Sequence, residues 1–143
     1  MKEVVIYTDG ACSGNPGKGG WAAVLLFHNQ KKTISGRKES TTNNQMELIA
    51  VINGLKALKI PCNVNLYTDS IYVKKGITEW INKWRVNNWK TSNKKPVKNI
   101  DLWKELENVS MQHSINWKWV KAHAGNKHNE EADFLARAEI NNA

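Results

Sequence analysis

The stretches "VVIYTDG" (residues 4–10) and "VNLYTDS" (residues 64–70) end two apolar runs in the same way. Each run leads through Tyr-Thr to an aspartate, Asp9 or Asp69, and a small residue follows. A buried carboxylate is costly unless something compensates its charge. If the two runs form adjacent parallel strands, both aspartates lie at the same edge of one sheet.

Together with these two runs, the sequence predicts five strands. Apolar or alternating segments place them at 3–9, 21–29, 32–40, 63–69 and 114–123. The second and third are joined by a short polar turn, which is typical of an antiparallel meander. A glycine-rich turn is expected over 10–20 and a basic loop over 91–99.

Helical spacing of apolar residues predicts a helix that starts near Asn43, is capped by Thr42 or Asn43, and is closed by Pro61. Shorter helices are expected at 70–76, 78–89 and 101–109, and a last helix at 130–140. This order predicts an α/β fold with a mixed five-stranded sheet. An antiparallel three-stranded meander and two parallel strands make up that sheet, and helices flank it.

Length and composition favour one soluble domain. The chain has 143 residues, and no apolar run approaches the roughly 20 residues that span a bilayer. It shows no secretory signal pattern, and Cys12 and Cys62 are too few for a disulfide framework. We therefore expect a reduced, cytoplasmic protein.

The net charge of +8 is concentrated in one segment. Residues 74–98 contain eight lysines and arginines against one acid, Glu79, so the remainder is nearly neutral. Such a patch favours a polyanionic partner, of which nucleic acid is the commonest. The alternative interpretation is a solvated basic face without a partner.

Two further acids stand out from the polar surface. Glu47, in "QMELIAVI", is expected on the helix face turned toward the sheet, whereas Asp133 cannot be separated from Glu130 and Glu131 by sequence alone. Converging carboxylates repel one another unless cations neutralise them, and oxygen ligands suit Mg²⁺ or Mn²⁺. Two such ions about 4 Å apart can hydrolyse a phosphodiester. The alternative for each aspartate is an ordinary turn former after a strand.

Three other chemistries are disfavoured. "GNPGKGG" lacks the first glycine and the final Ser or Thr of a phosphate-binding loop. The two cysteines are 50 residues apart without flanking histidines, which disfavours zinc. No local base would activate Cys12 as a nucleophile.

Four motifs in order carry a family resemblance: "YTDGACSGNPGKGG", "TTNNQMEL", "YTDSIYV" and "WVKAHAGNKHNEEADFLAR". Together they resemble the type 1 ribonuclease H family, in its bacterial single-domain form, over roughly residues 4–140. The resemblance implies one ribonuclease H catalytic domain over 1–143, with a basic helical protrusion at about 74–98. It implies endonucleolytic hydrolysis of the RNA strand of RNA–DNA hybrids, leaving 3′-hydroxyl and 5′-phosphate ends. Two Mg²⁺ ions with substrate bound, Mn²⁺ as a substitute, a monomer, and no membrane or obligate protein partner are implied as well.

The resemblance also implies roles for individual residues. It makes Asp133 the fourth metal-site carboxylate beside Asp9, Glu47 and Asp69, and His123 the mobile loop histidine. Positions that touch the hybrid in the minor groove are Cys12, Asn15, Asn43 and Asn44, and a pocket for a DNA phosphate involves Asn15 and Thr42. The substrate-binding residues of the basic protrusion are Trp80, Lys83, Trp84, Arg85 and Lys90. For the two tryptophans, packing of the helix onto the body is an equal alternative.

Two positions depart from the family pattern: Ile71 replaces a glutamine that contacts the hybrid, and Ser40 replaces an arginine that holds phosphate. Two other functions are alternatives to the ribonuclease. A DNA-processing nuclease of the integrase or resolvase kind shares the fold class, but "TTNNQMEL" argues against it. A catalytically silent hybrid-binding module is disfavoured by the intact acids.

Overall fold

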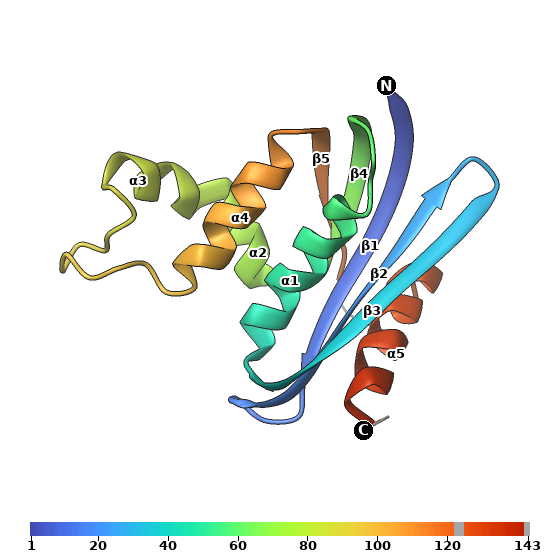
Figure 1. Ribbon diagram of the computed structural model, residues 1–143, viewed down its shortest axis with the longest axis horizontal. Coiled ribbons are helices and arrows are strands. Elements are labelled where there is room, and N and C mark those ends of the chain that lie inside the picture. The colour runs from blue at the N-terminus through green and yellow to red at the C-terminus, as the bar shows by residue number, and fades with distance from the viewer. Residues whose placement is uncertain (122–124, 142–143) are drawn as a thin grey trace.

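The computed structural model describes residues 1–121 and 125–141 and confirms the predicted α/β fold (Figure 1). Strands β1 (Lys2–Cys12), β2 (Gly17–Phe27) and β3 (Gln30–Thr41) form an antiparallel meander. Strands β4 (Cys62–Thr68) and β5 (Ser114–Trp119) extend the sheet by parallel pairing, so that the order is β3-β2-β1-β4-β5.

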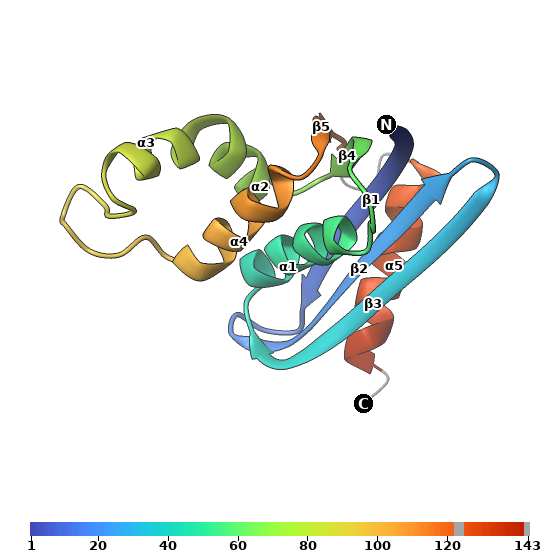
Figure 2. The same ribbon diagram turned by 45° about the horizontal axis from the view of Figure 1, so that its top comes forward.

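Helices cover both faces of the sheet (Figure 2). On one side lie α1 (Asn43–Lys56) and α4 (Ile100–Ser110), and on the other lies α5 (Lys127–Asn141). The period of two along β1 sorts its side chains: Val4 and Ile6 join the large core under α1, whereas Tyr7 joins a smaller core with Ala132 of α5. Within the described residues, no helix is long and apolar enough to cross a membrane.

The basic segment leaves the body as a helical protrusion, olive to yellow in Figure 1. It starts from α2 (Ile71–Lys75), continues through a π-helical turn η1 (Gly76–Trp80) and α3 (Ile81–Val86), and returns through a loop to α4. We call residues 74–98 the basic protrusion. A tryptophan cluster attaches it to the body: Trp84 lies 5.3 Å from the ring of Trp103, which is fully buried in α4.

Three predicted boundaries were wrong. The glycine-rich segment is mostly strand, since β1 runs to Cys12 and pairs with Gly19 and Gly20, which leaves a turn at 13–16. Helix α1 ends at Lys56 with Ala57 as its C-cap, so Pro61 does not close it. Strand β5 ends at Trp119, short of the expected 123.

Candidate active site

The register of the two central strands brings the two opening aspartates together. Tyr7 pairs with Tyr67 across the parallel β1–β4 ladder, and the two rings stack with centroids 4.5 Å apart. Asp9 and Asp69 each follow their tyrosine by two residues and therefore occupy equivalent positions. The expected adjacency of the two runs is confirmed.

Helix α1 brings the third carboxylate to the same edge. Thr42 caps the helix by accepting a hydrogen bond from the backbone N–H of Gln45, and Glu47 follows with only 5% exposure. The close approach requires glycine at position 10, since a Cβ there would lie 2.5 Å from the backbone nitrogen of Glu47. The buried position expected for Glu47 is thus observed.

Four acids converge at this edge, and we call Asp9, Glu47, Asp69 and Asp133 the carboxylate cluster. One oxygen from each of the first three lies within 4.8 Å of the others. Asp133, on α5, reaches Asp9 through a side-chain hydrogen bond and is paired with Arg137 at 2.8 Å. Sequence alone could not separate Asp133 from Glu130 and Glu131, and the contact with Asp9 supports Asp133. Its role as the fourth metal-site acid stays a prediction.

Burial and mutual repulsion disfavour the charged forms of these acids. Burial, followed by the charge of Asp69, raises the pKa of Asp9 to about 9. Burial and the charges of Asp9 and Asp69 raise the pKa of Glu47 well above its usual range. The pKa of Asp69 is also raised by burial, although hydrogen bonds from Asp9 and Asn129 oppose the shift.

The donor set fits a hard divalent cation. All of its atoms are carboxylate oxygens, which Mg²⁺ and Mn²⁺ prefer. The buried Oε1 of Glu47 has no hydrogen-bond partner among the described residues, an arrangement that is costly for a carboxylate unless a cation contacts it. A cation at this point would compensate the charges that otherwise favour protonation.

The sequence analysis missed Asn129. This buried residue faces Asp69, where hydrogen bonding from its side chain lowers the pKa of the carboxyl, and its own Oδ1 has no partner among the described residues. It precedes Asp133 by four residues, so both lie on the same face of α5. That i,i+4 spacing is the signal that could have found it.

The residues expected to touch the hybrid's minor groove form one surface beside the cluster. The Oδ1 of Asn15 accepts a hydrogen bond from the backbone N–H of Asn43 at 3.2 Å. The Sγ of Cys12 lies 3.4 Å from the carbonyl oxygen of Thr41, next to the cap residue Thr42. Asn15, Asn43 and Asn44 are exposed, so their polar groups are open to a ligand.

The protrusion residues divide into two groups. Lys83 and Lys90 are exposed, whereas Trp80 and Trp84 are partly buried with ring centroids 5.8 Å apart. Packing on the body therefore accounts for at least part of the role of the two tryptophans.

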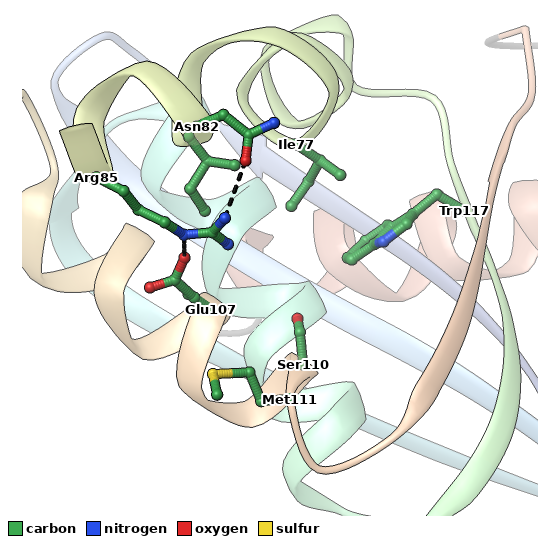
Figure 3. Close-up of a pocket in the computed structure, with 8 residues that line it drawn as sticks. Ile77, Asn82, Arg85, Glu107, Ser110, Met111 and Trp117 are labelled. Carbon is green, nitrogen blue, oxygen red and sulfur yellow. Dashed lines mark hydrogen bonds and ion pairs between the residues drawn. The ribbon is translucent and has the colours of Figure 1, made fainter.

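Arg85 makes contacts within the protein (Figure 3). Its guanidinium pairs with Glu107 of α4, and its Nη1 donates to the Oδ1 of Asn82 at 2.9 Å. These residues border a cavity of about 230 Å³ between the protrusion and the body. The expected contact of Arg85 with substrate thus competes with an ion pair inside the protein.

His123 lies outside the described residues. His128 packs its ring 5.4 Å from that of Tyr7 and approaches Glu131 at 3.4 Å. Ile71, directly after Ser70 at the start of α2, is 69% exposed, and Ser40 is exposed as well.

Comparison with known proteins agrees with this geometry. The RNase H family profile matches residues 1–141. Ribonuclease H of Wolbachia pipientis wMel is 73% identical over 139 residues, 97% of this chain and 96% of that protein. LC9-RNase H1, a type 1 RNase H with the type 2 active-site motif, superposes with a TM-score of 0.90 at 29% identity, over 99% of this chain and 74% of that one. Foamy viral protease-reverse transcriptase in complex with RNA/DNA hybrid gives a TM-score of 0.85 at 26% identity, over 99% and 20% of the respective chains. The chain therefore belongs to the ribonuclease H family.

Proposed function

We propose that this protein is an endonuclease that hydrolyses the RNA strand of RNA–DNA hybrids at the carboxylate cluster, leaving 3′-hydroxyl and 5′-phosphate ends. The observation that carries the proposal is the convergence of four acids at one sheet edge, where a buried Glu47 oxygen has no hydrogen-bond partner within 1–121 and 125–141. Family membership supports the reaction, and a structural neighbour with the same fold holds an RNA/DNA hybrid.

The cofactor we propose is a pair of Mg²⁺ ions, which Mn²⁺ can replace, bound by Asp9, Glu47, Asp69 and Asp133. Bound ions of this kind supply an activated water and stabilise the leaving oxygen of a phosphodiester. The chain contributes fixed ligand positions: β1 and β4 hold the two aspartates in register, and α1 holds Glu47 against Gly10. Asn129 orients Asp69 through its hydrogen bond.

Selectivity for hybrid over other duplexes would come from the surface beside the cluster. Asn15, Asn43 and Asn44 offer amide groups that can read 2′-hydroxyls across a wide minor groove without reading base sequence. Cys12 and Thr42 border the same surface. Exposed lysines of the basic protrusion would hold phosphates and supply salt-dependent affinity.

The proposal extends to the domain organisation of the chain and to its cellular compartment. We infer a single catalytic domain over 1–143 in which residues 74–98 serve as a substrate-binding protrusion. Both cysteines, Cys12 and Cys62, are free thiols, which supports a reducing compartment such as the cytoplasm.

The test is to incubate the protein with end-labelled RNA–DNA hybrid, double-stranded RNA and duplex DNA, each with Mg²⁺, with Mn²⁺ and with EDTA. The expected result is cutting of the RNA strand of the hybrid alone, with either ion, and none with EDTA. Cutting of duplex DNA would instead indicate a DNA-processing nuclease. Hybrid binding without cutting would indicate a silent binding module.

A further inference from the structure

The Tyr-Thr-Asp sequence of β1 recurs where β4 ends, and both of its threonines, Thr8 and Thr68, are fully buried. The β1–β4 ladder pairs Tyr7 with Tyr67, so the threonines that follow occupy equivalent positions in the two strands. Neither threonine belongs to the carboxylate cluster or to the surfaces expected to bind substrate. Their side chains nevertheless differ in what they hydrogen-bond.

The hydroxyl of Thr68 closes a turn around Asp69. Its Oγ1 accepts a hydrogen bond from the backbone N–H of Ser70 at 3.1 Å, and this bond spans the aspartate between them. Such a bond from a Ser or Thr side chain to the backbone two residues later fixes a local turn. Ser70 is itself held, because its Oγ caps α2 by accepting from the N–H of Val73 at 3.1 Å. The backbone on both sides of Asp69 is therefore fixed.

Thr8 makes no corresponding hydrogen bond. Its Oγ1 is buried and has no partner among the described residues. Its methyl carbon Cγ2 faces α1, where a Cβ on Gly54 would lie 3.7 Å away. A buried hydroxyl without a partner lowers the stability of the folded state. Thr8 therefore contributes packing, and its hydroxyl holds nothing in place.

The lengths of the two strands explain why only one aspartate depends on a hydroxyl. Strand β1 continues beyond Asp9, which pairs with Ala22 in the antiparallel ladder with β2. Strand β4 ends at Thr68, and Asp69 lies in neither a strand nor a helix. The ladder therefore holds the backbone of Asp9, whereas the turn closed by Thr68 holds the backbone of Asp69.

We propose that Thr68 is a positioning residue of the metal site, acting through Asp69, and that the equivalent Thr8 is not. This inference rests on the proposed function, in which Asp69 is a ligand of Mg²⁺. Without the Thr68 hydroxyl, the Asp69 carboxylate is free to move away from Asp9 and Glu47, whose nearest oxygens lie within 4.8 Å of it. The surfaces that would contact the hybrid stay as they are. Loss of the hydroxyl should therefore weaken metal binding and leave substrate affinity unchanged.

The experiment compares the wild type with Thr68→Val, Thr68→Ser and Thr8→Val. Valine keeps the β-branched shape that suits a strand and removes the hydroxyl, whereas serine keeps the hydroxyl. Thr8→Val is the matched control, because it makes the same change at a fully buried threonine directly before the other aspartate. Isothermal titration with MgCl₂ alone, without substrate, measures metal affinity, and steady-state kinetics on one RNA–DNA hybrid measure kcat and KM.

For Thr68→Val we expect Mg²⁺ affinity to fall about tenfold, a usual effect of removing a residue that orients a metal ligand. At low Mg²⁺, kcat should fall with it while KM stays nearly unchanged, and Thr68→Ser should resemble the wild type. Thr8→Val should match the wild type in Mg²⁺ affinity and kcat and melt about 2 °C higher, because an unpaired buried hydroxyl is removed. Thr68→Val combined with Asp69→Asn should bind Mg²⁺ as Asp69→Asn alone does, since Thr68 acts through that carboxylate.

Wild-type Mg²⁺ affinity in Thr68→Val would overturn the inference, as would an equal loss of affinity in Thr8→Val. A loss in Thr68→Ser as large as in Thr68→Val would also overturn it, and a rise in KM alone would assign Thr68 to substrate binding instead. If Thr68→Val does not fold, Thr68→Ala against Thr68→Ser decides the same question, because only serine keeps the hydroxyl. Failure of the proposed function is a separate outcome, in which the wild type binds Mg²⁺ and cuts no hybrid.

Discussion

The carboxylate cluster and the basic protrusion carry opposite charges and are built in opposite ways. Asp9 and Glu47 are buried on long regular elements, and one carboxylate oxygen from each of Asp9, Glu47 and Asp69 lies within 4.8 Å of the others. The protrusion lysines are exposed on short helices and a loop. The buried carboxylates need a cation held at a fixed geometry to compensate their charge. The exposed lysines attract an anionic partner through solvent, and salt screens that attraction. Changes in the cluster should therefore alter the chemistry, and changes in the protrusion should alter affinity.

The largest effect should come from the cluster. Asp9→Asn and Asp69→Asn each remove one anionic ligand, so we expect the cleavage rate to fall at least about 10³-fold while hybrid binding is retained. Single-turnover cleavage and a separate binding measurement check both parts. Asp101→Asn, an exposed acid on α4, is the matched control and should be as active as the wild type. Wild-type turnover by Asp9→Asn would show that the carboxylate cluster does not carry the chemistry.

A smaller loss of rate is expected for His123→Ala. Imidazole exchanges protons near neutral pH, and the family resemblance makes His123 a loop histidine that assists proton movement or product departure without binding the metal. We expect kcat to fall roughly 10²-fold, at the low end for general acid–base groups, with little change in KM. Steady-state kinetics on one hybrid measures this effect.

His128→Ala is the control for that prediction. His128 contacts the ring of Tyr7 and the carboxylate of Glu131, which are structural neighbours. Its replacement should leave kcat close to wild type. A larger kcat loss at His128 than at His123 would reverse the two assignments.

Substitutions in the basic protrusion should change the affinity for the hybrid. Replacing Lys83, Lys90 and Lys94 by glutamine should raise KM and leave kcat nearly unchanged, because phosphate contacts contribute equally to the ground and transition states. The slope of log KM against log salt should fall by about one for each lysine that contacts a phosphate. Arg85 is left out of this set because it pairs with Glu107.

The control is a second triple lysine-to-glutamine variant, with all three changes outside the protrusion. Lys2, Lys32 and Lys59 are exposed, and Lys2 lies at the opposite end of β1 from Asp9. Their replacement should leave the salt slope nearly unchanged. Equal slopes for the two triple variants would mean that net charge alone, and not the protrusion, holds the hybrid.

The smallest effect concerns stability. A carboxyl whose pKa is raised on folding destabilises the folded state increasingly as pH rises from about 4 to about 9, because the folded form holds its proton longer. In EDTA, the Tm of the wild type should therefore fall across this range, and Asp9→Asn should fall less. At pH 8 the variant should melt about 2–4 °C higher, the shift expected for 1 kcal/mol. Thermal melts with and without Mg²⁺ measure this effect. A lower Tm for Asp9→Asn than for the wild type in EDTA would contradict the claim that the buried acids destabilise the metal-free protein.

Much of the fold was predictable because it rests on local patterns. The repeated ends of the two apolar runs placed Asp9 and Asp69 at one edge, and helical spacing turned Glu47 toward the sheet. Glycine misled the boundaries, since Gly10, Gly19 and Gly20 signal turns but lie in strands here. Close approach of α1 explains Gly10, and no local pattern reveals that contact.

The features that the sequence did not predict depend on contacts between residues that are distant in sequence. Pairing of Arg85 with Glu107 joins residues 22 positions apart, and the contact from Gln45 to Asn99 joins residues 54 apart. Asn129 is the exception, because its spacing of four from Asp133 is visible in the sequence. Its function was missed because an asparagine near a helix start is usually a cap.

The most direct test of the central claim uses a hybrid with one sulfur in place of a non-bridging oxygen at a single RNA linkage, as one pure diastereomer. If the carboxylate cluster holds hard cations against the phosphate that is cut, sulfur should slow cleavage in Mg²⁺, and the softer Mn²⁺ should restore it. Asp9→Asn should cut neither substrate with either ion. Equal rates for oxygen and sulfur in both ions, or cleavage that survives EDTA, would contradict the account.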